Sequence, residues 1–148
     1  QAAIHGVMAS LAKRLVKDGE GATKLVTIEV TGASSDRSAK AVGNTVAQSS
    51  LVKTALFGED ANWGRIVAAV GRAGVPIKLE CLKVFFEDNL VFESGKEVEG
   101  YDSDRADAIL KQDEYTITID LGMGSSKTSI LTCDLSVEYV HINADYRS

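Results

Sequence analysis

The chain has 148 residues, of which 45% are hydrophobic and 25% are charged, and its formal net charge is -5. This length suits one domain with a single core, and the composition is ordinary for a globular protein. The acidic balance argues against nucleic acid as a main partner, because phosphate binding relies on clustered lysine and arginine, and no apolar run approaches the length that spans a membrane.

The first half of the sequence changes repeatedly between helical and extended patterns. Ile4, Met8, Leu11 and Leu15 recur at helical spacing, and Gly19 follows as a candidate C-cap. Residues from Val26 onward alternate between apolar and polar, which is typical of a strand. The elements expected here are a helix over 1–19, a strand over 26–30, and helices over 36–46, 51–57 and 63–73.

The second half is dominated by extended patterns. The single proline, Pro76, marks a boundary, and 103–110 is the one helix expected beyond it. Strands are expected over 77–86, 90–92, 115–121 and 131–139, with the C-terminus as an edge strand. Because helices and strands mix without a strict βαβ repeat, we expect an α/β fold in which a mixed sheet packs with helices in a layered sandwich.

The stretch KDGEGATK, residues 17–24, places Glu20 between two glycines. It is not a phosphate loop, because that motif leads from a strand into a helix and here the order is reversed. The plainer interpretation is a helix C-cap and turn with Glu20 in solvent. The alternative is a ligand site, since a carboxylate flanked by glycines is accessible and binds an ammonium or amide N–H by a charge-assisted hydrogen bond.

The other polar motifs also have plain interpretations. In GEDANWGR the adjacent Glu59 and Asp60 are too few ligands for a magnesium site, and a capped helix start is the stronger hypothesis. Near the C-terminus, Asn143 and Ser148 either end an edge strand or offer an amide and a hydroxyl to a substrate carboxylate or amine. Cys81 and Cys133 lack CxxC spacing and fit buried thiols in a reducing compartment.

Three stretches of the chain occur together in one family. They are DGEGATK (18–24), SSLVKTALFGEDANWGRIVAAVGRAG (49–74) and YVHINADYRS (139–148). Together they resemble the C-terminal part of glutamate N-acetyltransferase, also called ornithine acetyltransferase, over essentially the whole of 1–148. One departure is Ser49-Ser50, where the family often has Ser-Pro, at a helix start.

The resemblance implies a fold that is part of a larger, autoprocessed α/β heterodimer. In that family a precursor cleaves itself before a threonine, which becomes the nucleophile at the start of the β chain. The implied reaction is a ping-pong transfer of an acetyl group from N-acetylornithine to glutamate in cyclic arginine biosynthesis, through an acetyl-enzyme and an oxyanion hole. The resemblance leaves open whether acetyl-CoA is also a donor.

Carried over residue by residue, 1–148 corresponds to the C-terminal segment of the β chain. The nucleophile is then expected upstream of Gln1, Thr23 is not that residue, and no catalytic residue is expected here, so this segment alone should be inactive. Glu20, Asn143 and Ser148 match the family's substrate-binding positions.

The resemblance also sets expectations for partners and location. We expect no metal or cofactor, and as partners the α chain, the upstream part of the β chain and other copies of the heterodimer. No nucleic acid or membrane partner is expected. The implied compartment is the cytoplasm, or the mitochondrial matrix in a eukaryote. Two alternatives stay open: a non-catalytic interaction domain, and a subunit of an Ntn-like amidase or aminopeptidase.

Overall fold

The structure, a computed structural model, describes residues 2–145 of the chain. Twelve elements follow one another along it. Their bounds are α1 (Ala2–Lys17), β1 (Leu25–Ala33), α2 (Asp36–Ala47), α3 (Ser50–Phe57), α4 (Trp63–Gly71), β2 (Lys83–Phe86), β3 (Asn89–Glu93), β4 (Lys96–Glu97), α5 (Ser103–Leu110), β5 (Glu114–Asp120), β6 (Ser126–Cys133) and α6 (Val137–Asp145).

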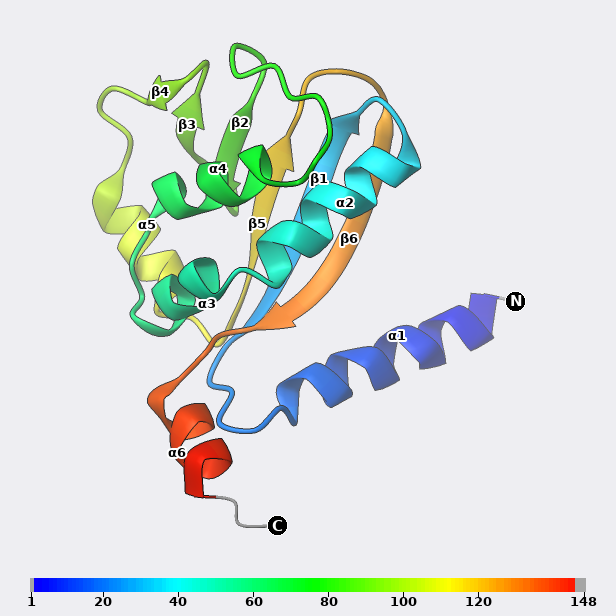
Figure 1. The fold of residues 1–148 in the computed structure, drawn as a ribbon, viewed down its shortest axis with the longest axis vertical. Helices are drawn as coiled ribbons and strands as arrows, with labels where there is room; N and C mark the ends of the chain where they lie inside the picture. The colour runs from blue at the N-terminus through cyan, green and yellow to red at the C-terminus, as the bar shows by residue number, and fades with distance from the viewer. Residues whose placement is uncertain (1, 146–148) are drawn as a thin grey trace.

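The strands form one six-stranded sheet in the order β4-β3-β2-β5-β1-β6. β1 runs parallel to β5, and the other neighbouring pairs are antiparallel, so the sheet is mixed as predicted. Helices α2 and α4 lie across one face of this sheet (Figure 1). The expected α/β class with a mixed sheet and a helical layer is confirmed. β6 is left at the edge of the sheet, beside α2.

The core lies between the sheet and its helical layer. Alternation along β1 buries Val26, Ile28 and Val30 completely, whereas Thr27 and Glu29 on the other face stay partly exposed. Ile28 pairs with the equally buried Ile117 of β5, so neighbouring strands present the same apolar face. The helices complete this core with small and branched side chains, among them Ala39, Val42, Val46, Val52, Leu56, Ile66, Val70, Ala106 and Leu110.

Two of the expected strands are wrong in their extent. The strand expected from residue 77 begins only at Lys83, because 78–82 form turns closed by the bonds from Cys81 N to Lys78 O and from Leu82 N to Leu79 O. The strand expected over 131–139 ends at Cys133, and Val137–Asp145 form a helix instead of an edge strand.

The change from β6 to α6 has a local cause. The side chains buried along this segment are Thr132, Asp134 and Ser136, whereas the apolar residues predicted to share a buried face are only half-buried or exposed. Ser136 Oγ accepts a hydrogen bond of 3.2 Å from Tyr139 N, which is the bond that an N-cap residue makes at the start of a helix. The polar residues therefore end the strand and begin α6.

Helices α1 and α6 extend away from the rest of the fold (Figure 1). Both carry apolar side chains that the described residues leave in solvent; the largest exposures are 77% for Leu15 in α1 and 59% for Val137 in α6. Exposed apolar surface of this kind often marks a site of interaction with another protein surface. None of the described helices combines the length and apolar character needed to cross a membrane.

Candidate functional site

The turn that carries Glu20 connects α1 to β1. It is closed by hydrogen bonds from Gly19 N to Val16 O and from Ala22 N to Gly19 O. Gly21 has φ +66, and a Cβ atom added there would lie 2.7 Å from Tyr139 N, at the first turn of α6. Glycine is thus required at position 21 by its left-handed backbone and by the close approach of α6. Glu20 itself is exposed, as predicted.

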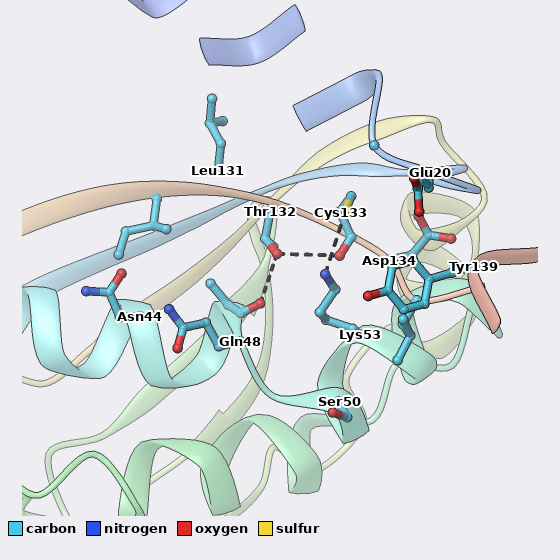
Figure 2. Close-up of a pocket in the computed structure, with 14 residues that line it drawn as sticks. Glu20, Asn44, Gln48, Ser50, Lys53, Leu131, Thr132, Cys133, Asp134 and Tyr139 are labelled. Atoms are coloured by element: carbon cyan, nitrogen blue, oxygen red, sulfur yellow. Dashed lines mark hydrogen bonds between the residues drawn. The ribbon is translucent and has the colours of Figure 1, made fainter. Parts of the chain in front are cut away.

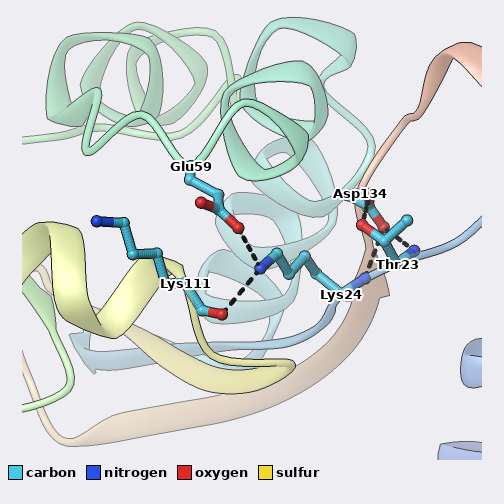
Figure 3. A network of polar contacts seen from close by, with 5 residues as sticks. All are labelled: Thr23, Lys24, Glu59, Lys111 and Asp134. Atoms are coloured by element: carbon cyan, nitrogen blue, oxygen red, sulfur yellow. Dashed lines mark hydrogen bonds and ion pairs between the residues drawn. The ribbon is translucent and has the colours of Figure 1, made fainter.

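Asp134 holds the next two residues of this turn (Figure 3). Its Oδ1 accepts hydrogen bonds from Thr23 N at 2.8 Å and from Lys24 N at 2.9 Å, and its Oδ2 accepts one from Thr23 Oγ1 at 2.7 Å. Asp134 is only 3% exposed. The hydroxyl of Thr23 therefore has a structural contact, and the carboxylate of Asp134 connects the end of β6 to the start of β1.

Lys24 joins the DGEGATK stretch to the GEDANWGR stretch. Its Nζ lies 2.7 Å from Glu59 Oε1 and donates to the Lys111 carbonyl at 3.2 Å, as Figure 3 shows. Glu59 has φ +54, a left-handed conformation that is uncommon for a residue other than glycine. The ion pair with a buried lysine helps to hold Glu59 there.

The rest of GEDANWGR is a capped helix start. Asn62 is the N-cap of α4 and its side chain accepts from Arg65 N. Trp63 packs at a ring-centroid distance of 5.0 Å from Phe92 and donates to Glu97 Oε2. The hypothesis of a capped helix start is confirmed. Among the described residues, no group of three potential metal ligands gathers.

Tyr115 is a buried phenol influenced by the charges of Asp134 and Glu59. The hydroxyl of Tyr115 has no hydrogen-bond partner among the described residues, and Tyr115 is 4% exposed. Burial raises the pKa of Tyr115, and the negative charges of Asp134 and Glu59 raise it further. Tyr115 therefore stays a neutral phenol at physiological pH.

The structure brings together Glu20 and Asn143, which are separated by 123 positions in the sequence. Asn143 Nδ2 donates to Glu20 Oε2 at 2.9 Å and to the Tyr139 carbonyl at 2.9 Å. The hydroxyl of Ser136 strengthens the same junction by donating to the Gly21 carbonyl at 2.6 Å. Ser148, the third predicted site residue, lies outside the described residues.

The contacts of Asn143 determine which part of its amide is available to a ligand. Both N–H groups of its amide already have acceptors, so the free group is the acceptor Oδ1. In this conformation its N–H groups are engaged by Glu20 and the Tyr139 carbonyl, and Asn143 can accept from a substrate amine, which is one of the two roles that the sequence left open. Glu20 and Asn143 together present oxygen acceptors, which suit a ligand ammonium or amide N–H.

A pocket of about 540 Å³ lies beside Glu20, where β6 passes α2 and α3 (Figure 2). This volume is in the range of small-molecule sites. Lys53 of α3 is the one lysine or arginine among the lining residues in the described part of the chain. The pocket is lined by Gly19, Glu20, Asn44, Ala47, Gln48, Ser50, Lys53, Ile130, Leu131, Thr132, Cys133, Asp134, Leu135 and Tyr139.

Several of these lining residues had no role in the sequence-based hypothesis. Asn44 of α2 and Gln48, the C-cap of that helix, are one helical turn apart and so lie on the same side of it. Lys53 lies within the 49–74 motif, which was the only signal for it, because a lysine on a short helix is usually solvated. Asp134 had no signal, since its partners are more than 100 positions away.

Comparison with known proteins places the whole chain in one family. The model of the ArgJ family matches residues 1–148. The arginine biosynthesis bifunctional protein ArgJ of Desulfotalea psychrophila is 52% identical over 148 residues, which cover all of this chain and 38% of that protein. The protein of the same name from Chlorobaculum tepidum is 47% identical, with 99% of this chain and 36% of that protein covered.

A solved structure agrees with the sequence comparison. The crystal structure of the arginine biosynthesis bifunctional protein ArgJ of Bacillus halodurans matches with a TM-score of 0.93 and 38% identity, over 98% of this chain and 68% of that one. The chain spans little more than a third of the curated relatives described above. On the family match over its full length and on these identities, the chain belongs to the ArgJ family.

Proposed function

We propose that this chain forms the substrate-binding C-terminal segment of an enzyme that transfers an acetyl group from N-acetylornithine to glutamate. The observation that carries the proposal is the contact between Glu20 and Asn143 at the edge of the pocket. Glu20 lines a pocket of small-molecule size, and its carboxylate together with the neighbouring amide oxygen of Asn143 suits an amino-acid nitrogen. The name of the relatives, which refers to arginine biosynthesis, supports an amino acid as the ligand.

In the proposed reaction the bond-making group belongs to sequence outside this chain. A threonine hydroxyl attacks the acetyl carbonyl of N-acetylornithine, the C–N bond breaks, and ornithine leaves with the proton. The amine of glutamate then attacks the acetyl-threonine ester, which restores the hydroxyl and releases N-acetylglutamate. Glu20 and the Oδ1 of Asn143 hold the ligand nitrogen during these steps, and Ser148 is proposed to complete the same site.

The proposed partners are an α chain, the upstream part of the β chain, and further copies of that heterodimer. The exposed apolar faces of α1 and α6 support partners of this kind, because such faces are stable in water mainly when another surface covers them. The proposed compartment is the cytoplasm, or the mitochondrial matrix in a eukaryote. The same exposed faces favour the second candidate function, a non-catalytic interaction domain.

The test uses the full-length protein with N-acetylornithine and glutamate. The proposal predicts that ornithine and N-acetylglutamate form together, and only when both substrates are present. Release of free acetate without glutamate would instead identify an amidase. Absence of any turnover, with the protein folded and processed, would favour the interaction domain.

The site assignment is tested by Glu20→Gln, which removes the charge and keeps the shape. We expect kcat/KM to fall by more than about tenfold, or about 1.4 kcal/mol of transition-state stabilisation. The matched control is Asp18→Asn, an exposed carboxylate in the same turn region with no described hydrogen bond. Equal activity of the Glu20 variant and the control would remove Glu20 from the site. Deletion of Ser148 should also lower activity while leaving the fold intact.

A further inference from the structure

The pocket beside Glu20 contains one positive charge whose partner is missing from the described residues. Lys53 rises from α3 toward the edge of β6, as Figure 2 shows. Its Nζ lies 3.7 Å from Cys133 Sγ, and that sulfur is its one described hydrogen-bond acceptor. A thiol sulfur is a weak acceptor, whereas an ammonium has three N–H donors. Most of the hydrogen-bonding capacity of Lys53 is therefore free for a ligand.

The backbone around Lys53 is fixed, so its position in the pocket is not accidental. Lys53 N donates to Ser49 O at 2.9 Å inside α3, and Lys53 O accepts from Leu135 N at 3.1 Å. The second bond ties α3 to the segment between β6 and α6, which also holds the Glu20 turn through Asp134. Lys53 and Glu20 thus belong to one connected framework.

Among the described residues, neither of the two carboxylates that line the pocket forms an ion pair with Lys53. Asp134 instead accepts three hydrogen bonds from Thr23 and Lys24, at the start of β1. Glu20 accepts from Asn143, and the described residues show no ion pair between Glu20 and Lys53. The pocket therefore presents a negative group and a positive group separately, which is the arrangement that a zwitterionic amino acid complements.

Neutral polar groups extend the positive side of the pocket. Asn44, Gln48 and Ser50 line it, and none of their side chains makes a hydrogen bond among the described residues. Each can donate to a carboxylate oxygen. Because the N–H groups of Asn143 are already engaged, the donors that the described residues offer to a ligand carboxylate in this pocket lie on the Lys53 side.

We propose that Lys53 binds the α-carboxylate of the amino-acid substrate, while Glu20 and Asn143 Oδ1 take its nitrogen. This inference rests on the proposed acetyl transfer for the identity of the ligand, and it adds the group that selects an amino acid over the corresponding amine. Lys53 is a specificity-determining residue in this scheme and takes no part in bond making.

The test compares two acetyl donors that differ only in the carboxylate. N-acetylornithine carries it, and N-acetylputrescine is the same molecule without it. In the full-length protein, Lys53→Met is expected to lower kcat/KM for N-acetylornithine by about tenfold or more, the effect of losing a charge-assisted hydrogen bond, and to leave kcat/KM for N-acetylputrescine unchanged. Lys40→Met is the matched control, since Lys40 is an exposed helical lysine outside the pocket.

The outcomes separate this inference from the proposed function. If the wild type is active and Lys53→Met changes both donors equally, or neither, the carboxylate role of Lys53 is overturned. If the wild type transfers no acetyl group, the proposed function fails. The carboxylate role of Lys53 is then tested by calorimetry, which compares the binding of ornithine with that of putrescine. A preference for ornithine that Lys53→Met abolishes supports the inference, and the absence of such a preference, or of binding, overturns it.

Discussion

Asp134 offers the sharpest test of how the site is held together. Replacing it by alanine removes the acceptor for Thr23 N, Thr23 Oγ1 and Lys24 N. The bond to Lys24 N is buried, whereas the Thr23 side is partly open to water. With about 1–3 kcal/mol for each buried donor left without an acceptor, and partial recovery by water at Thr23, we expect a loss of about 3 kcal/mol.

The assay is hydrogen exchange in the full-length protein, because it reports local opening residue by residue. A loss of about 3 kcal/mol corresponds to exchange roughly a hundredfold faster over residues 20–26. Asp134→Asn should cost only about 1 kcal/mol, because an amide oxygen still accepts both backbone N–H groups and the hydroxyl of Thr23 can rotate. The control, Asp107→Ala, changes an exposed carboxylate with no described hydrogen bond. Exchange in Asp134→Ala equal to that of the control would refute this account of the turn.

Three further predictions concern stability and can be measured by urea unfolding. Gly21→Ala should destabilise by about 2 kcal/mol or more, because position 21 has φ +66 and the new Cβ would lie 2.7 Å from Tyr139 N; a wild-type midpoint would contradict this. Tyr115→Phe should stabilise by about 1 kcal/mol, because it removes a buried hydroxyl that has no partner among the described residues, and any destabilisation would show that the hydroxyl has one. Hydrogen bonds from Lys13 and Lys17 of α1 lower the pKa of Glu114 below its ordinary value of 4.5. The stabilisation by this pairing is therefore complete above pH 4.5 and is lost as the pH falls through the lowered pKa, so the midpoint difference between wild type and Glu114→Gln should vanish on acidification.

The sheet could be predicted where one face of a strand is buried. Along β1 the alternating apolar residues Val26, Ile28 and Val30 are the ones buried against the helical layer, so the sequence pattern predicted the strand correctly. The same rule failed after Cys133, because the apolar residues of α6 do not face this core. Val137 and Tyr139 are 59% and 43% exposed, so their spacing reflects a helix with an apolar side away from the core. A pattern of period two and one of period 3.6 cannot be separated over so few residues.

The candidate site was predictable only in part, because its contacts join distant segments. Glu20 and Asn143 were found through their motifs, but their contact depends on the position of α6, which was expected to be a strand. Asp134 gave no signal, since an aspartate after a strand usually reads as a turn residue. The proposed role of Lys53 could not be predicted for a different reason. It depends on the pocket carboxylates already having other partners, and only the three-dimensional contacts show those partners.

The most direct measurement for the central claim is a crystal structure of the full-length protein with ornithine bound. The account predicts an ornithine nitrogen within about 2.7–3.2 Å of a Glu20 carboxylate oxygen and of Asn143 Oδ1, in the pocket beside β6. Ornithine bound at another place, with Glu20 and Asn143 in contact only with each other and with solvent, would contradict it.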